Sequence, residues 1–482
     1  MGKSPFIVLN IIKGAEEKKR GDERLRDKKQ WFHLEPPRGL LNDPNGLAFF
    51  RGKYYVFFQW NRFAKDHSYK EWGMFTSTDM LNWTFEGSAL LPDQTYDKCG
   101  TYSGSGLVID HKLCLFYTGN VKKDGRRKSS QCMAVTDDGH TFLKLGKVIE
   151  TPEEYTEHFR DPKVFRTREN GYYMVIGGQR KNGKGAVALF HSGDGFKWEY
   201  SGMPAVTESY EMIECPDLFQ LSGEYVLLYN PQSRDNEKDK DIFSFSAAKF
   251  IKFDEQKGFF NDNDLDRNFF RIDYGFDFYA PQTFEDANGR RILYAWMSRM
   301  DSAQESAFAG GEPRIHCLTL PRELRIREGK LLQMPVRELE QLKGEAVRAV
   351  RTDSGAYELN PPERAYSLRF SADDPKRKIA VRFHGGEASL TWFPKEQMVR
   401  FCRKNWLTGL EEQRECTLET FTEAEIWSDQ SSLEIFLNGG EAVMSSRIFP
   451  AGDKMEVIIS GIGGSGEIRM NRIKEEYRRN WE

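Results

Sequence analysis

The chain has 482 residues, which is more than one ordinary domain needs and enough for two or three. Its 70 basic and 73 acidic residues leave a formal net charge of −3. This near balance argues against a nucleic-acid partner or a polybasic membrane surface, because both require a basic excess. Aromatic residues at 13% and 42 glycines favour many short strands joined by tight turns.

Residues 1–30 are predicted to form a charged N-terminal extension. The apolar run at residues 6–12 is too short to span a bilayer, and charged residues follow it where a secretory signal would have a cleavage site. The seven cysteines are scattered and include no C-x-x-C pair, which favours free thiols in a reducing compartment. We therefore expect a cytoplasmic protein.

Residues 31–336 carry short aromatic and β-branched runs separated by turn residues, which is typical of strands. An Asp followed by a turn and an aromatic residue four positions later occurs three times, beginning at Asp79, Asp138 and Asp194. Four-stranded propeller blades fit this spacing, and about five such units fit the region, which predicts a five-bladed β-propeller. The alternative is that the motif is ordinary hairpin chemistry.

A second strand-rich region follows the first. Leu339 and Leu342 lie at helical spacing, which predicts a short helical linker over residues 337–347. Residues 348–482 return to a strand-rich pattern. The chain is therefore predicted to be all-β.

Two sequence patterns resemble cofactor or metal sites but lack surrounding features that such sites need. The glycine run that begins at Gly461 has dinucleotide-binding spacing but lies too near the C-terminus for the βαβ unit such a site needs. The acidic run that begins at Asp262 has Arg267 and Asp273 where a calcium loop has Gly and Glu. The eight histidines show no ligand spacing. We therefore expect neither a catalytic zinc nor a dinucleotide or calcium site in these segments.

Three carboxylates remain in unusual settings. Asp43 lies in a turn stiffened by the following proline, and Asp161 follows Arg160, which would keep it ionised. Glu214 lies among apolar neighbours, which favour the protonated form that a general acid needs. Each acid by itself is an ordinary turn or capping residue. Together, an ionised Asp and a protonated Glu make the pair that retaining glycoside hydrolases use.

The segments around these acids resemble the three signature motifs of glycoside hydrolase family 32, the β-fructofuranosidases. In chain order they read Asn42-Asp43-Pro44-Asn45-Gly46, Arg160-Asp161-Pro162 and Glu214-Cys215. Five further segments look like landmarks of the same family: Phe57-Phe58-Gln59-Trp60-Asn61, Tyr102-Ser103-Gly104-Ser105, Asp277-Phe278-Tyr279-Ala280-Pro281-Gln282, Leu320-Pro321-Arg322-Glu323-Leu324 and Asp429-Gln430-Ser431-Ser432-Leu433-Glu434-Ile435-Phe436.

The resemblance implies a five-bladed propeller that carries the site, followed by a β-sandwich over residues 348–482. It implies Asp43 as the nucleophile on a terminal β-D-fructofuranosyl unit, Glu214 as the acid/base, and Asp161 as the stabiliser that binds fructose hydroxyls. Retention of configuration follows, and the resemblance implies that no metal or organic cofactor is needed. The residues expected to bind the sugar are Leu40, Leu41, Asn42, Gln59, Trp60, Trp72, Tyr102, Ser103, Arg160 and Trp296.

The sequence departs from the common family pattern beside the site. Leu40-Leu41 stands where many relatives have Trp-Met, and Gln59-Trp60-Asn61-Arg62 stands where many have Gln-Tyr-Asn-Pro. The acids are untouched, so these departures concern the outer pocket. The loop over residues 61–72 also carries several basic residues, of which we nominate Arg62 and Lys65 as phosphate contacts. The alternative is a solvated surface loop.

The overall residue pattern of residues 61–91 is most similar to that of bacterial sucrose-6-phosphate hydrolases. A cytoplasmic location fits an imported, phosphorylated sugar. We therefore expect hydrolysis of sucrose 6-phosphate or sucrose, with a small sugar as substrate and neither a nucleic acid nor a membrane as partner. Two alternatives stay open. One is exo-hydrolysis of short inulin- or levan-type oligosaccharides. The other is a non-catalytic carbohydrate-binding propeller, against which the intact set of acids counts. The sequence does not indicate which oligomeric state the protein has.

Overall fold

The computed structural model describes residues 29–167, 171–233, 244–260, 263–298, 313–450, 452–464 and 466–479. All but the last two positions of the predicted charged extension, residues 1–30, lie outside the described residues, as does Asp262 of the rejected calcium-loop pattern. Strands dominate the described part, where the helical segments are short 3-10 turns. No helix within these ranges is long and apolar enough to cross a membrane.

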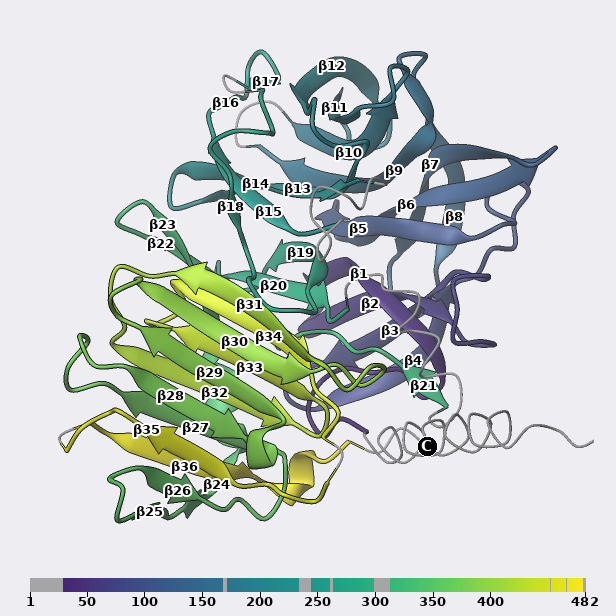
Figure 1. Cartoon of the computed structure of the whole chain (residues 1–482). Helices are drawn as coiled ribbons and strands as arrows, with labels where there is room; N and C mark the ends of the chain where they lie inside the picture. The colour runs from purple at the N-terminus through teal and green to yellow at the C-terminus, as the bar shows by residue number, and fades with distance from the viewer. Residues whose placement is uncertain are drawn as a thin grey trace, which may run out of the picture.

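Within the described residues, five sheets of four or five strands occupy the first part of the chain (Figure 1). The first sheet contains β1 (Gly39–Phe50), β2 (Lys53–Asn61), β3 (Glu71–Ser77), β4 (Trp83–Leu90) and β21 (Arg314–Ile315). The second contains β5 (Thr101–Ile109), β6 (Lys112–Lys123), β7 (Arg126–Thr136) and β8 (Leu143–Glu150). The third contains β9 (Tyr155–Arg166), β10 (Tyr172–Arg180), β11 (Gly185–Ser192) and β12 (Glu199–Val206).

The fourth sheet contains β13 (Met212–Leu221), β14 (Glu224–Gln232), β15 (Ala247–Ile251) and β18 (Phe270–Arg271). A small hairpin, β16 (Phe253–Asp254) and β17 (Phe259–Phe260), precedes β18. The fifth sheet contains β19 (Tyr279–Glu285), β20 (Arg291–Trp296), β22 (Arg322–Arg327) and β23 (Lys330–Pro335).

The first strands of these sheets lie next to one another in a closed ring, in the order β1, β5, β9, β13, β19 and back to β1. Strand β21 adds to the first sheet from late in the region by pairing parallel with β1, with Gly39 opposite Arg314 and Leu40 opposite Ile315. The late segment thereby ties the two ends of the ring together. The predicted all-β propeller is confirmed, and the blade number stays a prediction with which these sheets agree.

The repeated Asp motif marks the turn between the third and fourth strands of three sheets. Asp79, Asp138 and Asp194 each accept two hydrogen bonds, from the backbone N–H groups two and three residues later. Asp254 accepts the same pair of bonds in the β16–β17 turn. This turn departs from the repeated sequence pattern, because its aromatic residue, Phe259, stands five positions after Asp254.

Two facing sheets form the second part of the chain, which confirms the predicted β-sandwich (Figure 1). One contains β24 (Lys343–Val347), β36 (Ile468–Ile473), β27 (Tyr366–Ser371), β32 (Glu423–Asp429), β33 (Ser432–Leu437) and β34 (Ala442–Arg447). The other contains β25 (Ala349–Arg351), β26 (Tyr357–Leu359), β35 (Val457–Ser460), β28 (Ile379–Phe383), β29 (Ala388–Phe393), β30 (Met398–Lys404) and β31 (Glu411–Thr417).

Short 3-10 helices join or follow these strands: η2 (Arg337–Leu342), η3 (His384–Gly386) and η4 (Glu475–Tyr477). The predicted helical linker, residues 337–347, is divided between η2 and β24. Leu339 and Leu342 of η2 are both buried, because residues three apart share one side of a 3-10 helix.

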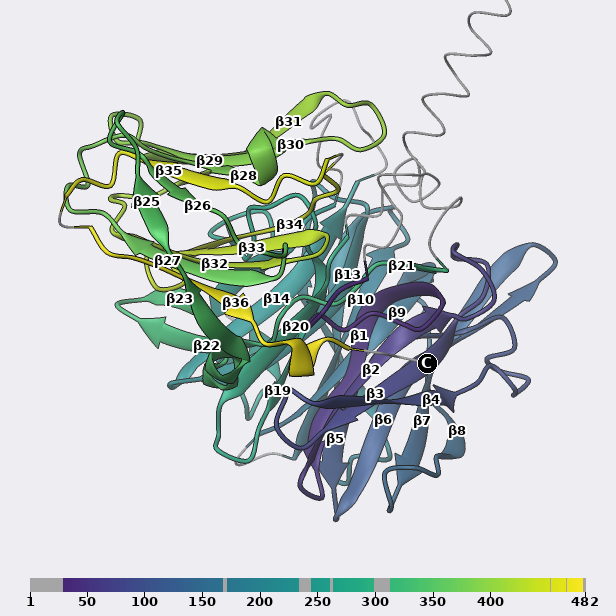
Figure 2. The ribbon, with the colours of Figure 1, turned by 90° about the horizontal axis from the view of Figure 1, so that it is seen from below.

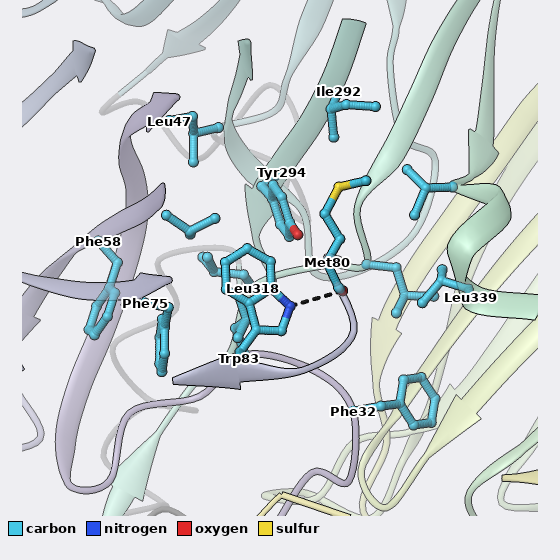
Figure 3. Close-up of a cluster of buried hydrophobic side chains, with 14 of the residues drawn as sticks. Phe32, Leu47, Phe58, Phe75, Met80, Trp83, Ile292, Tyr294, Leu318 and Leu339 are labelled. Carbon is cyan, nitrogen blue, oxygen red and sulfur yellow. Dashed lines mark hydrogen bonds between the residues drawn. The ribbon is translucent and has the colours of Figure 1, made fainter. Parts of the chain in front are cut away.

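The sandwich packs beside the first and fifth propeller sheets (Figures 1 and 2). One hydrophobic cluster spans this junction and includes Trp83 of β4, Tyr294 of β20, Trp427 of β32 and Phe32 from the segment before β1. Figure 3 shows part of it, including the hydrogen bond of 2.9 Å that the Trp83 indole donates to the Met80 carbonyl. The two folded parts therefore share a core.

Buried charges also cross the junction. His33 lies between two sandwich carboxylates, with Nδ1 2.8 Å from Asp429 and Nε2 3.0 Å from Glu434. Arg322 of β22 binds Glu434 at 2.6 Å and Asp273 at 3.1 Å. All five side chains are inaccessible to solvent. Paired in this way, the charges avoid the large cost of burial without a partner.

Candidate active site

The first strand of each propeller sheet is interrupted by a β-bulge. The pairing register shifts between Leu41 and Pro44 in β1, and corresponding shifts occur in β5, β9, β13 and β19. A bulge leaves residues unpaired and turns their side chains away from the direction that the regular pleat would give them. The bulges of the five neighbouring strands contain Asp43, Ser103, Asp161, Cys215 and Ala280.

The backbone angles and the prolines that follow explain why the strands are interrupted at these points. Asp161, Cys215 and Ala280 have positive φ angles of 70°, 42° and 50°, which disrupt a regular strand and are unfavourable for residues other than glycine. A proline also costs little where strand pairing is already interrupted, because it lacks an N–H group. Four of the five bulge residues precede one: Pro44, Pro162, Pro216 and Pro281.

Direct contacts show that these bulges bring the predicted acids together. The Cys215 N–H group donates to Asp161 Oδ2 at 3.0 Å, and the Cys215 thiol lies 3.8 Å from Asp43 Oδ2. Glu214 precedes Cys215 in β13. Carboxylates from β1, β9 and β13, far apart in sequence, therefore meet in one place.

Asp43 is surrounded by opposing influences on its ionisation. Burial raises the pKa of Asp43 above its ordinary value, and the neighbouring charge of Glu214 raises it further. Ser103 Oγ donates a hydrogen bond of 2.5 Å to Asp43 Oδ2, and this bond and the charge of Lys70 lower the pKa. The ionised form of Asp43 therefore depends on its donors.

Arg160 does not direct its hydrogen bonds to its sequence neighbour Asp161, which it was expected to keep ionised. Arg160 instead donates to Oε1 of Glu214, from Nε at 3.0 Å and from Nη2 at 2.5 Å. Burial raises the pKa of Asp161 above its ordinary value, the charge of Arg160 only partly offsets this, and Glu214 and Asp43 add to it. The bulge between residues 160 and 163 separates the two neighbouring side chains.

Glu214 is held at both carboxylate oxygens. Arg160 occupies Oε1, and the Tyr279 hydroxyl of β19 donates to Oε2 at 2.6 Å. Burial and the charge of Glu214 keep the pKa of Tyr279 well above its ordinary value, so the phenol remains a donor. Tyr279 is a site residue to which the sequence analysis assigned no role, although one of the quoted segments contains it.

Three of the predicted sugar-binding residues form a hydrogen-bonded chain that ends at Asp43. Asn42 Nδ2 donates to Gln59 Oε1 at 2.7 Å, and Gln59 Nε2 donates to Ser103 Oγ at 2.6 Å. Lys70, which is 5% exposed, donates from its ammonium group to Asn42 Oδ1. The sequence analysis did not single out Lys70 within its loop.

Trp296 and Tyr102 lie at the edge of this group. Trp296 is buried, and its ring meets those of Tyr279 and His67 edge to face at centroid distances of 6.4 and 6.1 Å. Tyr102 accepts a hydrogen bond of 3.0 Å at its carbonyl from the indole of Trp72, which is fully buried. Trp72 therefore supports the site through the backbone of Tyr102.

The remaining predicted apolar contacts are core residues. Leu40 and Leu41 are fully buried, and Leu40 packs in a cluster with Ile315. Trp60 packs edge to face on Phe85 at 5.3 Å. None of the contacts that join the acids involves these three side chains, and their contact with substrate stays a prediction.

Arg62 is already engaged on the outer part of the first sheet. Its Nε lies 3.5 Å from Glu71, and its Nη1 donates to Ser88 Oγ at 3.2 Å. The guanidinium also lies over the ring of Phe63, 4.9 Å from its centroid. Lys65 is partly exposed in the same loop. The assignment of Arg62 and Lys65 to phosphate binding stays a prediction.

Comparison with known proteins decides the family. Residues 33–335 match the glycosyl hydrolases family 32 N-terminal domain, and residues 364–474 match the family 32 C-terminal domain. The chain belongs to glycoside hydrolase family 32. The resemblance noted in the sequence is thereby confirmed, and the protein is a glycoside hydrolase.

Relatives of this glycoside hydrolase are similar over nearly its whole length. The sucrose-6-phosphate hydrolase of Bacillus subtilis (strain 168) is 40% identical over 449 residues, which cover 91% of this chain and 92% of that protein. The sucrose-6-phosphate hydrolase of Klebsiella pneumoniae is 39% identical over 440 residues, which cover 90% of each.

Solved structures show the same fold. A sucrose-6-phosphate hydrolase from Lactobacillus gasseri superimposes with a TM-score of 0.81 at 25% identity over 96% of both chains. A Bombyx mori GH32 beta-fructofuranosidase superimposes with a TM-score of 0.80 at 26% identity, over 95% of this chain and 96% of that one.

Proposed function

We propose that this enzyme hydrolyses terminal, non-reducing β-D-fructofuranoside bonds with retention of configuration, and that its substrate is sucrose 6-phosphate or sucrose. The observation that carries the proposal is the meeting of Asp43, Asp161 and Glu214 at neighbouring bulges, each with its own donors. The sucrose-6-phosphate hydrolases that match nine-tenths of the chain support the choice of sugar. A charged sugar phosphate does not cross a bilayer freely, so we also propose a cytoplasmic location.

In the first step, the Asp43 carboxylate attacks the anomeric carbon of the fructosyl unit while Glu214 protonates the departing oxygen. The bond from carbon to the leaving oxygen breaks, and a covalent fructosyl ester forms on Asp43. Arg160 and Tyr279 bind the Glu214 carboxyl and so fix its position beside the leaving group.

In the second step, Glu214 takes a proton from water, and the resulting hydroxide attacks the anomeric carbon and frees Asp43. Two inversions restore the original configuration. Asp161 binds fructose hydroxyls rather than the breaking bond, and Asn42, Gln59 and Ser103 complete the sugar pocket. Asp161 suits this role because its backbone is fixed by the hydrogen bond of 2.9 Å that its N–H group donates to Thr118.

Comparison of kcat/KM on sucrose, sucrose 6-phosphate and a short inulin oligomer tests the proposal. We expect sucrose 6-phosphate to be hydrolysed at least as efficiently as sucrose, and both to exceed the oligomer. Preference for the oligomer would favour the exo-hydrolase alternative. Binding of these sugars without any turnover would favour the non-catalytic alternative and contradict the proposed function.

A further inference from the structure

A line of hydrogen bonds runs from Lys70 to the carboxylate of Asp43, and every bond in it is donated toward Asp43. Lys70 Nζ donates to Asn42 Oδ1, and Asn42 Nδ2 donates to Gln59 Oε1 at 2.7 Å. Gln59 Nε2 donates to Ser103 Oγ at 2.6 Å, and Ser103 Oγ donates to Asp43 Oδ2 at 2.5 Å. The line thus joins a buried positive charge to the carboxylate proposed as the nucleophile.

The ammonium group sets this direction because it can only donate hydrogen bonds. Asn42 must turn its oxygen toward Lys70, which leaves its NH₂ group for Gln59. Gln59 then accepts with its oxygen and donates with its nitrogen to Ser103, whose hydrogen is left for Asp43. Without the ammonium, both amides can flip by 180° as a unit, and Ser103 can donate to Gln59 instead of Asp43.

We propose that Lys70 is a positioning residue that acts through Asn42 and Gln59 to fix the Ser103 hydroxyl as a donor to Asp43 and so keeps the nucleophile ionised. The inference rests on the proposed function, because it takes Asp43 as the nucleophile. It gives Lys70 a role distinct from reading a phosphate on the substrate. Hydrogen bonds arranged in such a line also polarise one another, which strengthens the last bond.

The groups that face Asp43 explain why it needs this donor. The carboxyls of Glu214 and Asp161 disfavour a negative charge on Asp43, and the Cys215 thiol, whose pKa burial raises well above its ordinary value, is not a source of positive charge. The positive charge of Arg160 is bound to Glu214. Burial raises the pKa of Asp43 most, and the hydrogen bonds from Ser103 and Asn42 and the charge of Lys70 lower it, the Ser103 bond being the largest of these three.

The groups around Lys70 hold it in place. His67 Nδ1 lies 2.9 Å from the ammonium and acts as its acceptor, which requires that nitrogen to be unprotonated. Asp66, in the same loop, is a nearby negative charge whose pKa is lowered chiefly by hydrogen bonds from Ser68 and in part by the charge of Lys70. The Lys70 carbonyl accepts from the Thr101 N–H group at 3.0 Å, which ties this segment to β5.

The pH dependence of kcat/KM tests the proposal. Lys70→Met removes the charge and the donor while keeping the side-chain length, so we expect the acid limb to move up by about one pH unit, because hydrogen bonds to charged groups are worth that much or more. The shift should be equal on sucrose and sucrose 6-phosphate. Lys70→Arg, which keeps a cationic donor, should restore the limb. Lys98→Met removes an exposed lysine and is the matched control.

A double-mutant cycle separates the hydrogen-bonded line from a simple effect of charge. Ser103→Ala should shift the acid limb by itself, and the combination of Lys70→Met with Ser103→Ala should shift it by clearly less than the sum of the two single shifts, because both changes break the same line and only the direct effect of the Lys70 charge remains. Fully additive shifts would mean that Lys70 acts on Asp43 through its charge alone, which would overturn the proposal. If Lys70→Met lowers Tm so far that it cannot be assayed, Lys70→Gln removes the charge with a polar side chain and should shift the limb in the same direction.

The results expected if Lys70 has no positioning role differ from the result expected if the proposed function is wrong. An unchanged acid limb in the Lys70 variants would overturn the role of Lys70 while leaving Asp43 as the nucleophile. A loss confined to sucrose 6-phosphate would make Lys70 a phosphate contact and would also overturn it. Full activity of Asp43→Asn would instead remove the premise, because Asp43 would then not be the nucleophile.

Discussion

At the scale of single residues, the two carboxyls proposed to act on the breaking bond have separate sets of donors. Glu214 is bound by Arg160 and Tyr279, whereas Asp43 is bound by Ser103 at the end of the line from Lys70. Substitutions in one set should therefore affect one chemical role more than the other.

Replacement of the proposed acid/base tests this separation. Glu214→Gln should slow hydrolysis of sucrose by about 10²–10⁴-fold, because the leaving oxygen then departs unprotonated. An activated aryl fructoside, whose leaving group needs no proton, should be affected far less in the first step. Its second step should become slow and be rescued by azide, which needs no general base. Equal losses on both substrates without rescue would identify Glu214 as a structural residue.

Basic residues of the loop before β3 are tested by the ratio of two substrates. A charge-assisted contact is worth roughly 1.5–3 kcal/mol, so Arg62→Ala or Lys65→Ala should cost ~10–100-fold in kcat/KM for sucrose 6-phosphate if that side chain binds the phosphate. Sucrose should be almost unaffected, and Lys98→Ala is the control. Parallel losses on both sugars would mean that the loop shapes the pocket, as the contacts of Arg62 with Glu71 and Ser88 allow.

At the scale of elements, the β-bulges in the first strand of each propeller sheet position the site residues. Each bulge leaves the ladder on either side intact, so a side chain with an unusual direction is held by a regular strand. Gly104 in β5 shows how closely these strands approach, because a Cβ added there would lie 1.9 Å from the Phe116 carbonyl oxygen. Only glycine permits this approach next to Ser103.

A single methyl group should therefore disturb this element. Gly104→Ala forces β5 away from β6, and we expect a loss of roughly 3 kcal/mol in the free energy of unfolding together with a large fall in kcat, since Ser103 moves with the strand. Gly193→Ala is the matched control, because nothing lies within 4 Å of the added Cβ. Urea unfolding and kcat measured on both variants give the comparison. Equal stability of the two would show that the strands are not closely fitted here.

At the scale of the whole molecule, the propeller and the sandwich are joined by a shared core and by buried charges. Asp429 accepts hydrogen bonds from the backbone N–H groups of Trp31, Phe32 and His33 at 2.8–3.2 Å, as well as from the His33 ring. The segment before β1 is therefore fastened to the sandwich, while β1 itself begins the propeller. Loss of this joint should loosen both parts together.

The joint predicts a dependence of stability on pH. Burial by itself would lower the pKa of His33, but the hydrogen bonds to Asp429 and Glu434 outweigh it and the pKa is raised. The stabilisation from charged His33 is therefore fully present below the ordinary value of 6.5 and is lost as pH rises through the raised value. The Tm difference between the wild type and His33→Gln should shrink as pH rises above 7. A constant difference from pH 6 to 9 would mean that His33 is not charged in the folded protein.

Some of these features were predictable from sequence and others were not. The acids and the propeller were predictable because Asp43-Pro44, Asp161-Pro162 and the repeated Asp turns are short, local patterns. The pairing of Arg160 with Glu214 was not, because a bulge separates Arg160 from its sequence neighbour and its partner lies 54 positions away. The ion pair of His33 with Asp429 joins residues 396 positions apart, and no local pattern encodes it.

The central claim is that Asp43 is the nucleophile of a retaining fructosidase, and kcat/KM of Asp43→Asn on sucrose tests it most directly. The substitution removes the nucleophilic charge with little change in volume, so Tm should stay near that of the wild type while kcat/KM falls at least about 10³-fold. A folded Asp43→Asn enzyme that keeps more than a small fraction of wild-type kcat/KM would contradict the account.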